Sequence, residues 1–165
     1  RRSSSAASDV YKRQKQTLER VAENFYLIPS NKERNSDAVL SQIQFDQDST
    51  EKIIAIRDIA LGFLEFEDQR DYKIEEFFNK SVKDSWLIKK TMSKIMDTKL
   101  TEQYEAIDKL IPNNWIRLIG AGNGGYFLVS SNIDEEKIQN LSTENCLKGI
   151  FKAKPSNEGL SNFVI

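Results

Sequence analysis

The chain alternates between stretches with apolar residues at helical spacing and short apolar runs typical of strands. Between residues 46 and 96, Ile, Phe, Leu and Trp recur every three or four positions, which predicts two long helices. After Pro112 the apolar runs become short and rich in aromatic and β-branched residues, which predicts strands. The predicted helices cover residues 17–24, 37–45, 46–68, 73–96, 101–111 and 134–141, and the predicted strands cover 24–30, 115–119, 126–131, 148–154 and 161–165.

The order of these elements predicts an α+β fold with an antiparallel sheet and helices covering one face. The first 14 residues fall outside that pattern. They hold two leading arginines and a cluster of small residues, but lack the apolar core of a signal peptide. We expect residues 1–14 to be a non-native tail resembling translated adaptor sequence, or a natural disordered basic tail, and residues 15–165 to form the domain.

Composition and charge exclude several function classes. With 24 basic and 25 acidic residues, the net charge of -1 provides no overall field for nucleic acid or an acidic membrane. The chain has no histidine, which removes Ser–His and Cys–His catalysis and histidine metal sites. The lone Cys146 cannot form an internal disulfide, so we expect a cytoplasmic protein that binds neither nucleic acid nor membrane.

A cluster of glycines lies between the apolar runs WIRLI and YFLVSS. Its six residues are Gly120, Ala121, Gly122, Asn123, Gly124 and Gly125. The spacing matches G-x-G-x-x-G, but a dinucleotide-binding turn requires a helix after the last glycine, and here a strand follows. Asn-Gly is typical of a hairpin turn. The further glycines either belong to a plain turn or, as we favour, let another backbone or a ligand come close.

The stretch IRLIGAGNGGYFLVSS resembles the third signature motif of the GHMP kinase superfamily. NFYLIPSNKERNSDAVLSQ, SVKDSWLIKKTMSKIMDTKLTEQYEAI and IFKAKPSNEGLSNFVI resemble the sugar-kinase branch typified by D-glycero-D-manno-heptose 7-phosphate kinase. The likeness extends over residues 15–165. Three features depart from the pattern: Asn123 stands where glycine is frequent, Arg117 stands where lysine is common, and IPNNW with the bulky Trp115 replaces a glycine-rich approach to the strand. The last departure leaves the exact heptose substrate open.

The resemblance implies that the chain is the ferredoxin-like C-terminal domain of an ATP-dependent sugar or sugar-phosphate kinase. In that family an N-terminal domain carries the Gly-Ser-Ser phosphate loop and the catalytic group, and binds ATP and Mg²⁺. No such loop precedes a helix in this sequence. We therefore expect no catalytic residue and no metal ligand in the chain, and expect it to be inactive alone. Its glycine hairpin, residues 120–125, is expected to support the phosphate loop of its own N-terminal kinase domain.

Three further residues are candidates for substrate binding. Arg34 and Ser36 lie in the segment similar to the family's Arg-Asn-Ser loop, and Arg117 precedes the glycine cluster. A guanidinium can pair with a sugar phosphate or a carboxylate. The alternative for Arg34 is a solvent-facing side chain beside a helix cap. Trp86 is expected in the core rather than in a substrate cleft.

The sequence also fits a function other than that of a kinase domain. Small α+β domains also bind ligands without catalysing a reaction, so a stand-alone ferredoxin-like ligand-binding or regulatory domain is the alternative.

Overall fold

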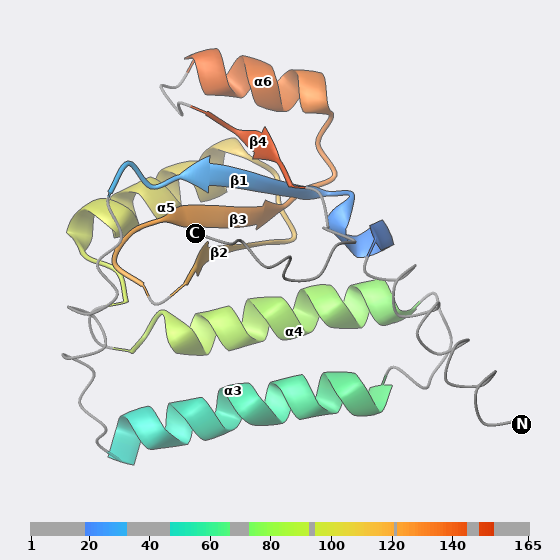
Figure 1. Ribbon diagram of the computed structural model, residues 1–165, viewed down its shortest axis with the longest axis vertical. Coiled ribbons are helices and arrows are strands. Elements are labelled where there is room, and N and C mark those ends of the chain that lie inside the picture. Colours follow the sequence, from blue (N-terminus) through green and yellow to red (C-terminus); the bar gives the residue numbers. More distant parts are fainter. Residues whose placement is uncertain are drawn as a thin grey trace, which may run out of the picture.

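A computed structural model describes the chain over residues 19–32, 47–66, 73–92, 95–120, 122–144 and 149–153. The fold is α+β and contains a four-stranded antiparallel sheet in the order β2-β3-β1-β4 (Figure 1). The strands are β1 (Phe25–Pro29), β2 (Trp115–Ile119), β3 (Tyr126–Ser130) and β4 (Phe151–Lys152). The helices are α3 (Gln47–Phe66), α4 (Ile74–Lys89), α5 (Thr98–Leu110) and α6 (Glu135–Glu144). This order and strand sense are compatible with a ferredoxin-like fold.

The strand register sorts the side chains onto two faces of the sheet. Directly paired residues share a face, because side chains alternate along each strand. One face carries two rows of paired apolar residues, namely Tyr26–Val129–Ile116 and Ile28–Phe127–Leu118. The opposite face carries the rows Phe25–Ser130–Trp115, Leu27–Leu128–Arg117 and Pro29–Tyr126–Ile119.

The first face carries the main hydrophobic core. Helices α5 and α6 supply Leu100, Ile107 and Ile138 to it, each almost fully buried. Trp86 of α4 joins the same core and is 1% exposed. Its ring lies 6.3 Å from that of Tyr104, between centroids. Apolar burial on this scale is the dominant stabilising term in a small domain, and the core position expected for Trp86 is confirmed.

The opposite face is only partly covered. Phe78 and Val82 of α4 pack against Phe25 and Trp115 there, and the indole N–H of Trp115 donates to Asn79 Oδ1 at 2.7 Å. Helix α4 therefore contributes to both faces, so the expectation of helices on one face only was too simple. Helix α3 lies on the side of α4 away from the sheet (Figure 1).

The connection between α4 and α5 differs from its prediction. The pattern predicted one helix over 73–96, but α4 ends at Lys89. Two downstream residues have other roles that a continuous helix would prevent. Ile95 is 2% exposed in the core, and Asp97 takes an extended conformation as the N-cap of α5. Its carboxylate accepts from the Leu100 N–H at 2.9 Å, which moves the start of α5 forward to Thr98.

The other elements agree with the pattern to different degrees. Strands β1, β2 and β3 and helices α3 and α6 are confirmed within one to three residues at most ends. The strand predicted over 148–154 is only two residues long, Phe151–Lys152. The predicted helix 37–45, the strand 161–165 and the tail 1–14 lie outside the described residues.

The core position of Trp86 gives a direct stability test. Trp86→Ala removes the largest fully buried side chain, and we expect it to lower the free energy of unfolding by about 3–5 kcal/mol. Its neighbour Leu87, which is 41% exposed, is the control, and Leu87→Ala should cost less than about 0.5 kcal/mol. Urea unfolding followed by circular dichroism measures both. Similar losses for the two variants would contradict the placement of α4.

Candidate functional site

The glycine cluster forms the loop of the β2–β3 hairpin, and the backbone conformation explains its composition. Each described residue of the loop has a positive φ: Gly120 (97°), Gly122 (111°), Asn123 (56°), Gly124 (147°) and Gly125 (100°). Residues with a Cβ rarely adopt such angles, whereas glycine does so readily and Asn tolerates the left-handed region. The loop thus needs four glycines for its own path, beyond the Asn-Gly pair of a simple turn. The φ angles by themselves fit both a plain turn and a loop that another backbone approaches closely.

The loop is fastened to two other segments by backbone hydrogen bonds. The Asn123 N–H donates to the Ile95 carbonyl at 2.8 Å, which ties the loop to the α4–α5 connection. The Gly125 N–H donates to the Lys32 carbonyl at 3.2 Å, and the Gly125 carbonyl accepts from the Ser30 N–H at 2.9 Å. The two bonds of Gly125, to Ser30 and Lys32, continue the pairing of β1 and β3 beyond the ends of both strands. The loop is therefore held on both sides.

Gly122 is also required by space. A Cβ at this position would lie 3.0 Å from the Ile95 carbonyl oxygen and 3.2 Å from the Ile95 Cα. Both are backbone atoms that cannot rotate away. The close approach predicted for this loop is thus present at Gly122, and the backbone that approaches belongs to this chain.

Two lysines contact the loop, at Asn123 and at Gly120. The Lys32 ammonium donates to Asp97 Oδ2 at 2.6 Å and to the side-chain oxygen of Asn123. The Lys89 ammonium, at the end of α4, donates to the Gly120 carbonyl at 3.0 Å. The hydrogen bond from Lys32, together with that from the Leu100 N–H, lowers the pKa of Asp97 below its ordinary 3.8. One ammonium, paired with Asp97, therefore lies at Asn123, and a second lies at Gly120.

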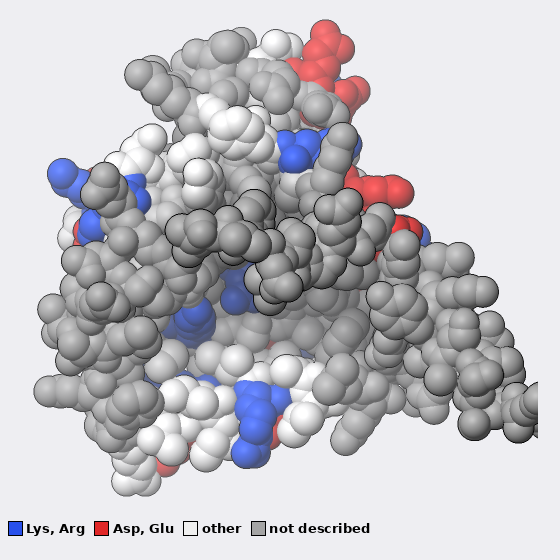
Figure 2. Space-filling view, in the orientation of Figure 1, with Lys and Arg blue, Asp and Glu red and all other residues white. Residues whose placement is uncertain are grey.

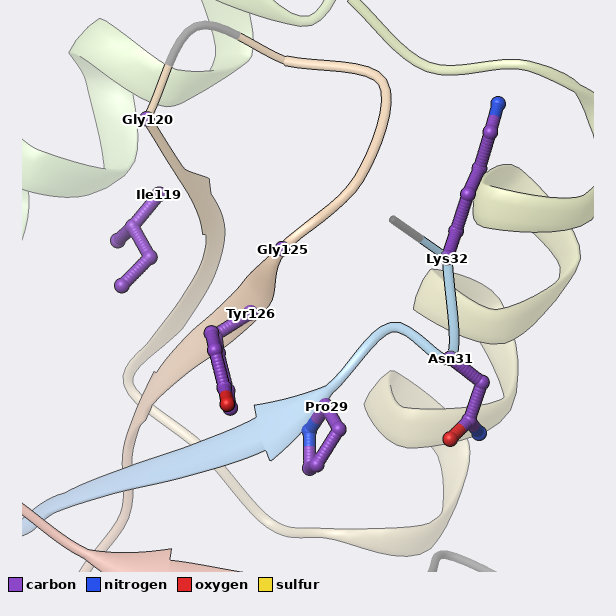
Figure 3. Close-up of a pocket in the computed structure, with 7 residues that line it drawn as sticks. All are labelled: Pro29, Asn31, Lys32, Ile119, Gly120, Gly125 and Tyr126. Atoms are coloured by element: carbon purple, nitrogen blue, oxygen red, sulfur yellow. The ribbon is translucent and has the colours of Figure 1, made fainter. Parts of the chain in front are cut away.

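A hollow of about 520 Å³ opens beside the loop, on the partly covered face of the sheet (Figure 3). Its floor is the row Pro29–Tyr126–Ile119, whose members are neighbours across three strands. Its other lining residues are Asn31, Lys32, Gly120 and Gly125. Tyr126 is 45% exposed, so its ring is accessible from solvent. A glycine rim, an accessible aromatic ring and a neighbouring ammonium are compatible with binding a polar ligand or another protein loop.

The structure separates Arg117 from this hollow. Arg117 lies one row away, paired with Leu128, and its side chain lines a different groove between β2 and helices α3 and α4. Burial lowers the pKa of its guanidinium below the ordinary value, and its Nε is buried without a hydrogen-bond partner. Arg117 and the glycine loop thus do not line one cavity.

The remaining predicted residues cannot be placed. Arg34, Ser36 and Ala121 lie outside the described residues. The sequence did not predict a role for Lys32 at the loop. Its side-chain partners are 65 and 91 positions away along the chain, so no local pattern indicates the contact. Asp134 caps α6, since its carboxylate accepts from the Glu136 N–H at 3.0 Å at the start of that helix.

A scan against protein families and a search of curated proteins find no match to this chain. Within the described residues, no group of three or more His, Cys, Asp or Glu is placed to hold a metal ion. No helix in that part of the chain is long and apolar enough to cross a membrane.

The close approach at Gly122 predicts a loss of stability. Gly122→Ala should lower the free energy of unfolding by about 1–3 kcal/mol, because it adds a Cβ at positive φ against the Ile95 backbone. Gly62→Ala is the matched control. Gly62 lies within α3 with no atom within 4 Å of an added Cβ, so this change should stabilise by about 0.5–1 kcal/mol. Urea unfolding measures both variants. Changes of the same sign in their free energies of unfolding would contradict this explanation of the loop.

The Lys32–Asp97 pair predicts a dependence of stability on pH. Because the pKa of Asp97 is lower in the folded chain, its contribution is complete above about pH 4 and is lost as pH falls through the folded value. Asp97→Asn keeps an oxygen to cap α5 but loses the charge. Thermal melts should place this variant below the natural chain at pH 7, with the gap closing toward pH 2. A gap that stays constant over this range would rule out the ion pair as its cause.

Proposed function

We propose that this chain is the C-terminal part of an ATP-dependent sugar or sugar-phosphate kinase of the GHMP type. One observation supports this more than any other. The hairpin resembling the family's glycine motif has a loop in which every described residue has positive φ, and it stands beside the end of β1. A loop nearly free of side chains exposes its backbone to whatever packs against it.

The hydrogen bonds of the loop favour support of a neighbouring loop over direct capture of an anion. The N–H groups of Asn123 and Gly125 already donate within this chain, so neither is free for a phosphate. What the hairpin offers is a loop of nearly bare backbone, with the Lys89 ammonium on Gly120 and the Lys32 ammonium on Asn123. Residues 120–125 therefore serve, in this proposal, as the backing of a phosphate loop carried by an N-terminal kinase domain.

The residues present are suited to the flank of a phosphate site. ATP with Mg²⁺ supplies the γ-phosphoryl group, and catalysis of its transfer depends mainly on positioning and on stabilising negative charge. Lys32 and Lys89 place positive charge near the hairpin, although each also has a partner in the chain. The catalytic group and the ligands of ATP and Mg²⁺ are assigned to the N-terminal domain. The proposed enzyme acts in the cytoplasm on a small sugar or sugar phosphate.

The test uses the protein encoded when the reading frame is extended upstream of codon 15. We expect a Gly-Ser-Ser phosphate loop in that extension, and Mg²⁺-dependent release of ADP from ATP with one or more members of a panel of hexoses, heptoses and their monophosphates. A native start codon near Lys15, or an extended protein that transfers no phosphate to any member, would contradict the proposal.

Tyr126 provides a matched pair of variants for the extended protein. Tyr126→Asp places a carboxylate in the hollow and should lower turnover about tenfold or more, by repelling the phosphates of ATP. Tyr126→Asn introduces a side chain of nearly the same shape as Asp but without the charge, so its turnover should fall much less. Because Asp and Asn remove the same ring contacts and are similarly poor strand residues, the two variants should have melting temperatures close to each other. Equal activity in the Asp and Asn variants would show that the hollow does not face phosphates.

A further inference from the structure

A second cavity, the α3–α4 groove, lies on the same side of the sheet as the hollow but has no lining residue in common with it. It encloses about 380 Å³. Three elements supply its lining: Ile56, Ile59 and Ala60 from α3, Phe78, Ser81, Val82, Ser85 and Lys89 from α4, and Arg117 from β2. Five of these nine side chains are apolar. A mainly apolar cavity of this size with a few polar groups is typical of small-molecule sites.

Arg117 is the unusual member of this lining. Its strand neighbours across the sheet are Leu128 and Leu27, so the guanidinium lies at the end of an apolar row. The buried Nε has no hydrogen-bond partner, and no carboxylate occurs among the described lining residues. A partly buried cation with no counter-charge among the described lining residues pays a desolvation cost, and an anion that pairs with it recovers part of that cost.

Lys89 adds a second positive charge to the groove. This residue lines the groove, and its ammonium donates to the Gly120 carbonyl, at the edge of the glycine loop. In the space-filling view, basic atoms are visible in a depression near the middle of this face, above α3, whereas acidic side chains gather at the α6 end (Figure 2). Two of the described lining residues, Arg117 and Lys89, are thus cationic, and most of the others are apolar.

We infer that the α3–α4 groove is a binding site for a small organic anion, with a carboxylate or phosphate on Arg117 and an apolar body between α3 and α4. The volume fits one such molecule, and the guanidinium can donate two parallel hydrogen bonds to either anion. The inference does not depend on the proposed kinase activity, because the groove is built entirely from this chain and is separate from the hollow at the glycine loop.

The test compares two fluorescent probes of similar shape on the chain itself. One is the anion 8-anilino-1-naphthalenesulfonate, and the other is the neutral N-phenyl-1-naphthylamine. We expect saturable binding of the anion. Arg117→Met should weaken it about tenfold or more and leave the neutral probe nearly unchanged, since methionine keeps the apolar wall and loses the charge. Arg57→Met makes the same change of charge on the exposed side of α3 and should have no effect.

Displacement of the anionic probe distinguishes the two headgroups. Displacement by octanoate assigns a carboxylate, displacement by octyl phosphate assigns a phosphate ester, and failure of both would overturn the inference. Equal binding of the anionic probe to Arg117→Met and the natural chain would also overturn it. Ala60→Trp, which fills the groove and leaves the Arg117 side chain in the sequence, should abolish binding of both probes, and it decides the question if Arg117→Met does not fold. Unchanged binding to Ala60→Trp would place the probes elsewhere.

Discussion

The hydrogen bond from the Asn123 N–H to the Ile95 carbonyl, at 2.8 Å, is the contact on which the rest of this face depends. It holds the hairpin loop against the α4–α5 connection, and the path that the loop takes there has positive φ at each described position. Gly122 then lies against Ile95 with no room for a Cβ. Four glycines in six residues are the consequence of one backbone path.

That path also separates the two cavities. By turning toward Ile95 and Lys32, the loop leaves the row Pro29–Tyr126–Ile119 open as the floor of the hollow. The next row ends in Arg117, which faces α4 and α3 instead. The Lys89 ammonium bridges the two regions through the Gly120 carbonyl. The proposed phosphate-handling edge and the proposed anion groove are thus neighbours that can be tested independently.

The sequence predicted the elements well where one physical signal dominated. Apolar spacing located α3 and α6, and short β-branched runs flanking Asn-Gly located the β2–β3 hairpin. The prediction failed at the α4–α5 connection, because Ile95 continues the helical spacing although its side chain is buried beside the loop. It also missed Lys32, whose partners Asp97 and Asn123 are distant in the sequence. Contacts between residues far apart in the sequence cannot be predicted from its hydrophobic periodicity.

The proposed kinase places the glycine hairpin beside bound phosphates in the intact protein. Amide hydrogen exchange of the upstream-extended protein, with and without a non-hydrolysable ATP analogue and Mg²⁺, measures this. We expect slower exchange in residues 120–125 and 30–32 when the nucleotide is bound, with little change in α6. Nucleotide binding that leaves exchange in the hairpin unchanged would rule out this position of the hairpin.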